Sequence, residues 1–205
     1  MRMAEARLEE LFHQGLLWRG GKGPLDSARL LASGFSELDE LIGGWPRGAL
    51  VELLCAGSVG LSLLLPLLAR LSGEGRWLAW VDPPWHPHAP ALAARGVALS
   101  RVLRVRTGGA GEALWAAEQL LRSGNCAVVM LWPGRFSQAA VRRLQLAAAK
   151  GDSLGVLFRP WRAAQQPSLA ALRLQVQAGE AGLRVRILKR RGGRSGAEVE
   201  LTCSG

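Results

Sequence analysis

The sequence has 205 residues, 49% of them hydrophobic, and a formal net charge of +10 from 26 Lys and Arg against 16 Asp and Glu. This length allows one generous domain or two small ones, and the apolar content excludes a disordered chain. The basic excess favours acidic partners, nucleic acid among them, or reflects a solvated surface rich in arginine. The three cysteines, Cys55, Cys126 and Cys203, are widely spaced. They fit neither a disulfide framework nor a zinc site, which suits a reducing cytoplasm. We expect neither a metal nor a cofactor.

The chain starts with a charged amphipathic segment rather than a signal peptide. Residues 4–18 place Leu8, Leu11, Phe12, Leu16 and Trp18 at helical spacing, and the glycine-rich stretch 20–24 then breaks the pattern. We therefore predict an N-terminal helical arm and linker over residues 1–24 and one domain over residues 25–205. The most apolar run, residues 61–71, is too short to span a bilayer, so we expect a cytoplasmic protein without membrane contact.

From residue 36 onwards the apolar periodicity alternates between helix and strand. The pattern predicts helices over 36–42, 58–72, 90–95, 112–122 and 138–149, and strands over 49–54, 76–81, 101–106, 126–131 and 154–158. Such β-α units form a parallel sheet covered by helices on both faces. Residues 172–176, 183–188 and 198–201 are short alternating runs separated by glycines, which predict a C-terminal β-meander and a mixed sheet edge.

The loop after the first long strand is where an α/β sheet of this kind binds phosphate. A phosphate-binding Walker A loop has the pattern G-x-x-x-x-G-K-[ST], in which the lysine neutralises the phosphates and the hydroxyl holds magnesium. Here Cys55 replaces the first glycine and Leu61 replaces the lysine, while Gly60 and Ser62 remain. Gly57 and Ser58 lie within this degenerate loop. We therefore predict no nucleotide hydrolysis.

An ordered series of phrases resembles RecA between about residues 30 and 190. The lead-in 31–39, the G-x-P-x-G-like stretch 44–48 and the segments 94–103 and 111–124 carry this resemblance. It implies a RecA-like α/β fold. The departures imply lost catalysis: Asp82 is followed by Pro83-Pro84-Trp85 without the catalytic glutamate, and the strand that should end in the Walker B aspartate ends in Trp132-Pro133. A divergent ATPase stays an alternative.

Within this superfamily the chain resembles the ImuA family, on residues 43–50, 89–92, 113–119, 142–148 and 188–192. That resemblance implies a non-catalytic accessory role in SOS-induced translesion synthesis and mutagenesis, a part of DNA repair after DNA damage, with nucleoid association after damage. The implied partners are an ImuB-type inactive Y-family polymerase and an error-prone DnaE-type polymerase, with RecA and nonspecific DNA as further candidates. The alternative family is SulA, a RecA-like cell-division inhibitor that lacks a phosphate loop and binds FtsZ.

Two groups of side chains are candidates for contacts with a partner or with DNA. The basic group has Arg142 and Arg143 on a helix, then Lys189, Arg190, Arg191 and Arg194 in a glycine-containing β-turn that should present them outward. A solvated charged face is the alternative for the helix pair. The aromatic group comprises Trp18, Trp85 and Trp161 in the arm or loops, because exposed tryptophans anchor interfaces. Trp77, Trp80 and Trp115 are expected in the core.

Overall fold

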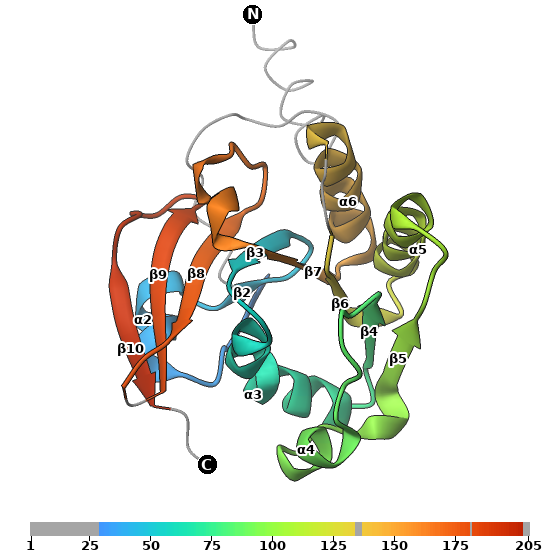
Figure 1. Ribbon diagram of the computed structural model, residues 1–205, viewed down its shortest axis with the longest axis horizontal. Helices are drawn as coiled ribbons and strands as arrows, with labels where there is room; N and C mark the ends of the chain where they lie inside the picture. Colours follow the sequence, from blue (N-terminus) through green and yellow to red (C-terminus); the bar gives the residue numbers. More distant parts are fainter. Residues whose placement is uncertain (1–28, 134–136, 181, 203–205) are drawn as a thin grey trace, which may run out of the picture.

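The computed structural model describes residues 29–133, 137–180 and 182–202 (Figure 1). The predicted arm over residues 1–24, including Trp18, lies outside the described residues, and so does Cys203. Two short strands that the sequence did not predict, β1 (Leu30–Leu31) and β2 (Trp45–Pro46), pair antiparallel beside helix α2 (Ser36–Ile42). Gly43 ends α2 with a φ of 78°, the left-handed conformation that a helix-ending glycine adopts readily.

An eight-stranded sheet forms the centre of the domain, in the order β10-β9-β8-β3-β7-β6-β4-β5. Its parallel part consists of β3 (Leu50–Leu54), β4 (Trp77–Val81), β5 (Val102–Val105), β6 (Cys126–Leu131) and β7 (Leu154–Arg159). The meander, β8 (Leu172–Ala178), β9 (Gly182–Arg190) and β10 (Glu198–Thr202), is antiparallel within itself. It joins the sheet through parallel pairing of β8 with β3. The predicted mixed α/β sheet with a terminal meander is confirmed.

Helices cover both faces of this sheet, as the alternating pattern predicts. Helices α2, α3 (Val59–Gly73) and α4 (Ala89–Ala94) pack on one face, around a core that includes Leu63, Leu67 and Trp80. Helices α5 (Ala110–Ser123) and α6 (Gln138–Gly151) lie side by side on the other face. Two 3₁₀ turns, η2 (Leu99–Arg101) and η3 (Trp161–Gln165), complete the described elements. Successive strand residues alternate between the two apolar layers, which is the expected pattern for a sheet buried on both sides.

Asp39 stabilises the segment 31–39, which precedes the central sheet. Its carboxylate accepts hydrogen bonds from the Ser33 N–H at 2.9 and 3.0 Å, and Leu38 beside it is fully buried. Gly34 follows with a φ of 91°, and a Cβ there would lie 2.4 Å from the Pro66 side chain of α3. The S-G-x-x-x-L-D phrase therefore fixes the approach of α2 to the core and is structural rather than catalytic.

Candidate functional site

The degenerate phosphate loop lies between β3 and α3, at the carboxyl end of the parallel strands. Cys55 is buried and its N–H donates to the Arg159 carbonyl at 3.0 Å, while Gly57 and Ser58 are exposed. Leu61 and Ser62 are half-buried, and Leu61 packs against the apolar layer under α3. Burial raises the pKa of the Cys55 thiol, so the group stays protonated and is a poor nucleophile.

Aromatic side chains occupy the ends of β6 and β7, where RecA-like enzymes carry polar catalytic groups. Trp132 and Phe158 stack with ring centroids 4.4 Å apart and planes inclined by 7°, and Trp80 lies 6.0 Å from Trp132. Gly60 abuts this stack, because a Cβ at that position would lie 3.1 Å from the Phe158 ring and 2.8 Å from Cys55 Sγ. This apolar packing replaces the polar groups that coordinate magnesium and orient water in phosphoryl transfer.

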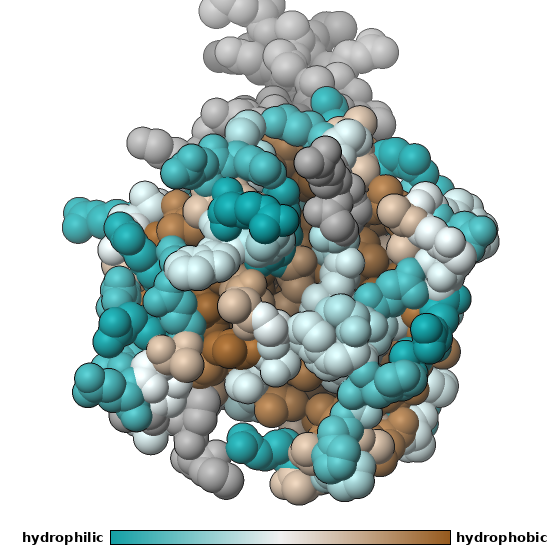
Figure 2. Space-filling view, viewed as in Figure 1, coloured by the Kyte–Doolittle hydropathy of each residue, from teal (hydrophilic) through white to brown (hydrophobic). Residues whose placement is uncertain are grey.

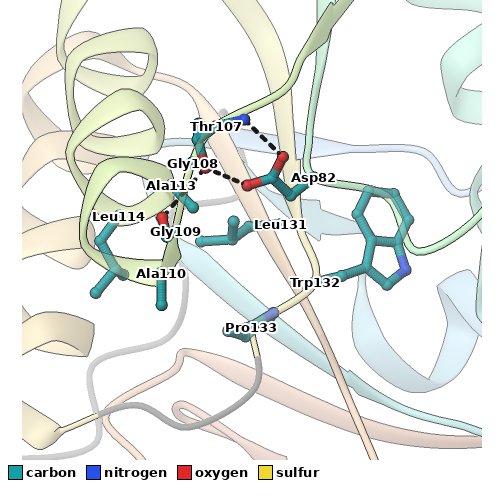
Figure 3. Close-up of a pocket in the computed structure, with 10 residues that line it drawn as sticks. All are labelled: Asp82, Thr107, Gly108, Gly109, Ala110, Ala113, Leu114, Leu131, Trp132 and Pro133. Atoms are coloured by element: carbon teal, nitrogen blue, oxygen red, sulfur yellow. Dashed lines mark hydrogen bonds between the residues drawn. The ribbon is translucent and has the colours of Figure 1, made fainter.

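Asp82, the acidic residue that follows β4, makes a structural contact. It has a φ of 46° and accepts hydrogen bonds from the N–H of Thr107 at 2.9 Å and from its hydroxyl. Figure 3 shows the aspartate turned toward Thr107 at the wall of a pocket of about 290 Å³, which Trp132 and the glycines before α5 also line. Because both carboxylate oxygens are engaged, Asp82 is poorly suited to activate a water molecule.

A buried charged cluster lies on β3 and β8, where the 3₁₀ turn η3 packs on the sheet. Glu52 in β3 is fully buried and accepts hydrogen bonds from Arg159 at 3.2 Å, Arg173 at 2.7 Å and the Ser168 hydroxyl at 2.6 Å. Arg173 also donates to the carbonyls of Ala163 and Ala164, both in η3. The cluster thus clamps the 3₁₀ turn onto the sheet. Sequence patterns did not indicate it, because Glu52 lies more than 100 residues from its three partners.

The clamped turn presents Trp161, which is 60% exposed. Trp161 borders an apolar pocket of about 270 Å³ whose other walls come from the degenerate loop and the end of β8. These lining residues are Leu54, Cys55, Ala56, Val59, Val176, Gln177 and Ala178. In the space-filling view, apolar surface also appears between the hydrophilic side chains of the periphery (Figure 2). An exposed tryptophan held by a rigid support beside an apolar hollow is typical of a protein-binding surface.

The other predicted tryptophans divide between the core and the surface. Trp80 is fully buried, as expected, and Trp85 is half-buried beside a second pocket between the start of α3 and α4. The core assignment is wrong for Trp115, which is 62% exposed on α5, and for Trp77, which is 38% exposed under the Arg101 guanidinium. Helical spacing alone did not reveal that Trp115 faces away from the sheet.

The structure disperses the basic side chains that the sequence grouped together. Arg142 and Arg143 are both exposed on α6, and Arg143 pairs with Glu118 of α5. The expectation of an outward-facing basic turn is wrong for Lys189 and Arg190. Lys189 donates to the Ser168 carbonyl at 2.7 Å, and burial lowers its pKa. Arg190 donates to the Leu41 carbonyl at 2.8 Å.

The last two members of that turn differ from each other. Arg191 is half-buried, and its N–H donates to the Ala171 carbonyl at 2.8 Å, while burial lowers the pKa of its side chain. Arg194 is exposed. Lys189 and Arg190 therefore hold the meander against the rest of the domain, and the turn is not a continuous basic surface.

Fold and site together define a RecA-like domain whose nucleotide site has become apolar. The RadB recombinase crystal structure has the same fold: it superimposes with a TM-score of 0.65 over 82% of this chain and 94% of that chain, at 16% sequence identity. The predicted RecA-like fold is thereby confirmed.

The sequence comparisons give a closer relationship, with SulA. Residues 56–155 match the family model described as cell division inhibitor SulA. SulA of Edwardsiella piscicida is 44% identical over 112 residues, which cover 54% of this chain and 64% of the relative. SulA of Photorhabdus laumondii is 35% identical over 111 residues, 54% of this chain and 63% of the relative. The matched region thus spans less than two thirds of these curated relatives.

A crystal structure of SulA from Pseudomonas aeruginosa is 30% identical and covers 54% of this chain and 97% of that chain, with a TM-score of 0.46.

These relationships correct the functional hypothesis drawn from the sequence. The match is to SulA, so the assignment to translesion synthesis and mutagenesis is wrong, and the ImuA-specific resemblance is unconfirmed. The predicted partners, the ImuB-type and DnaE-type polymerases, RecA and DNA, fall with that assignment. The prediction of a non-enzymatic protein agrees with the description of the matched relatives as cell division inhibitors. Among the described residues, no helix is long and apolar enough to cross a membrane.

Proposed function

We propose that this protein inhibits cell division by binding FtsZ, as a SulA-like member of the SOS response to DNA damage. The observation that carries the proposal is the match of residues 56–155 to the SulA family, with 44% identity to one member over 112 residues. A cytoplasmic location is part of this proposal, because FtsZ assembles there.

The aromatic side chains at the ends of β6 and β7 support the proposal that the protein inhibits by binding rather than by catalysis. Trp132 and Phe158 stack where polar catalytic groups would be needed, and Asp82 is held by Thr107. The fold therefore supplies a rigid platform instead of a catalytic centre. Binding energy in such a protein comes from a few buried aromatic and arginine anchors on its surface.

The surface around Trp161 is the part of this platform that we assign to FtsZ. The indole is exposed, the adjacent pocket is apolar, and the turn that carries it is clamped through Glu52 and Arg173. A clamped anchor loses little conformational freedom on binding, which favours affinity. Trp115, with 62% exposure on α5, is a matched tryptophan outside this surface.

Sedimentation of purified FtsZ polymers with GTP tests both parts of the proposal. Wild-type protein should lower the amount of pelleted FtsZ in proportion to its concentration. Trp161→Ala should weaken this inhibition at least about tenfold, the loss expected for an anchor worth more than about 1.4 kcal/mol, whereas Trp115→Ala should inhibit like wild type. Wild-type protein without effect on FtsZ would refute the function; equal inhibition by Trp161→Ala would refute the assigned surface alone.

A further inference from the structure

Helix α6 carries an exposed stripe that combines apolar and basic side chains. Leu146 is 59% exposed, although it lies in the middle of a 14-residue helix that packs on the sheet. Exposed residues recur at intervals of three and four positions, which places them on one side of the helix. They are Ala139, Arg142, Arg143, Leu146, Ala149 and Lys150.

The neighbouring helix α5 extends this surface. Trp115 is 62% exposed, and Glu118, which is buried one turn further along α5, forms ion pairs with both Arg122 and Arg143. The acidic group between the two helices is therefore already neutralised. Within the described part of the chain, neither Arg142 nor Lys150 has an acidic partner. This surface offers an apolar contact and at least one unpaired cation to an acidic, apolar occupant.

The chain enters the described domain next to this surface. The guanidinium group of Arg29 lies 3.5 Å from the carboxylate of Asp152, the residue that caps the carboxyl end of α6. The backbone carbonyl of Arg29 accepts a hydrogen bond from the Arg47 N–H. Helix α6 is about 21 Å long at 1.5 Å per residue, and the ten residues 19–28 reach at most about 33–36 Å when extended. The segment before residue 19 can therefore reach the whole stripe.

The preceding sequence complements the stripe in charge and pattern. Leu8, Leu11, Phe12 and Leu16 fall within one arc when successive residues are placed 100° apart; Glu5 lies within that arc and Glu9 borders it. Glu10 falls on the opposite side. A second copy of α6 would instead bring basic side chains against basic side chains, Arg142 against Arg142 or Lys150 according to the register, so a symmetric pairing of two α6 stripes is electrostatically unfavourable.

We propose that residues 4–18 pack as a helix along α6 of the same chain, with Leu8 and Phe12 over Leu146 and Trp115. The parallel direction is part of this proposal: it places residue 18 beside the carboxyl end of α6, where the chain enters the domain at Arg29, whereas an antiparallel segment would need the linker to run back along the whole helix. This direction places Glu5 and Glu9 near Arg142, in the first half of the helix. The α5–α6 surface is then an internal docking surface, distinct from the surface around Trp161.

Hydroxyl-radical footprinting of the full-length protein tests this packing, because it reports the solvent exposure of individual side chains. In Leu8→Asp/Phe12→Asp, oxidation of Trp115 and Leu146 should rise several-fold over wild type. Oxidation of Trp161, which is 60% exposed elsewhere, should not change and serves as the internal control. Equal oxidation of Trp115 and Leu146 in both proteins would overturn the proposal. Protection that disappears on dilution would also overturn it, because the segment would then come from a second copy.

A charge exchange tests the direction of packing independently. Arg142→Glu should raise the oxidation of Leu146, and adding Glu9→Arg should restore protection. Adding Glu10→Arg instead should not restore it, because Glu10 lies on the other side of the segment. Rescue by both second substitutions, or by neither, would contradict the proposed pairing of Glu9 with Arg142.

Discussion

At the scale of single residues, Glu52 shows how a buried charge can position a surface. Its carboxylate is fully buried and is shared by Arg159, Arg173 and Ser168. Both guanidinium groups are almost completely buried as well, so removing the negative charge would leave two cations without compensation. Such a cluster gives little net stability relative to apolar residues, yet it is costly to break from one side.

Glu52→Gln should therefore lower the free energy of unfolding by about 3–5 kcal/mol, measured by urea denaturation. Glu198→Gln is the matched control, because Glu198 of β10 is a half-exposed ion-pair partner of Arg184 in β9. This substitution should change the free energy of unfolding by less than about 1 kcal/mol. Similar small losses for the two variants would mean that the cluster does not hold the turn of Trp161 in place.

Gly60 is the residue whose size decides whether the aromatic stack can form. An alanine there would press on Cys55 Sγ and on the Phe158 ring, so Gly60→Ala should cost about 1–3 kcal/mol of unfolding free energy. Gly73, at the other end of α3, has no atom within 4 Å of an added Cβ. Gly73→Ala should leave stability unchanged or raise it by up to about 1 kcal/mol. Urea denaturation of both variants measures this difference. Equal stabilities would contradict the close packing of Gly60 against Cys55 and Phe158.

At the scale of elements, the loop between β3 and α3 has lost more than its lysine. Restoring the motif with Cys55→Gly/Leu61→Lys should not restore ATP binding, because Trp132 and Phe158 still occupy the ends of β6 and β7. Isothermal titration calorimetry with ATP and magnesium should give no heat beyond dilution. Binding in the micromolar range by the double variant would show that the aromatic stack leaves room for a nucleotide.

The elements were predictable from the sequence because their signals are local. Apolar periodicity placed each long helix and strand to within about two residues, and glycine spacing indicated the meander. The pairing of β8 with β3 was not predictable, since it joins segments separated by more than 100 residues. The β1–β2 ribbon was missed because two-residue strands carry no period.

The site was less predictable than the fold, because function depends on which side chains meet. The missing lysine and the replaced aspartate were visible in the motifs. The stack of Trp132 on Phe158 could not be predicted without knowing that β6 and β7 are neighbours in the sheet. Lys189 and Arg190 resembled a free basic turn, since their carbonyl partners, Ser168 and Leu41, lie far away in the sequence. The function was misassigned, and the ImuA-specific resemblance is unconfirmed, because RecA-like phrases are shared among proteins of different function.

At the scale of the whole molecule, the meander is part of the main core although the SulA match ends at residue 155. Leu174 and Val176 of β8 and Val185 of β9 belong to the same apolar cluster as α3. Strand β3 lies between β7 and β8, and it contributes side chains to both apolar layers. Breaking the meander away would therefore expose the centre of the sheet.

The domain should consequently unfold in one cooperative transition. Far-UV circular dichroism, which reports all strands and helices, and tryptophan fluorescence, to which the fully buried Trp45 and Trp80 contribute, should give the same urea midpoint. If the meander were a separate unit, ellipticity would change first while the fluorescence of the buried Trp45 and Trp80 stayed native. That outcome would mean that the apolar contacts of Leu174 and Val176 with the α3 layer do not couple the meander to the region shared with SulA.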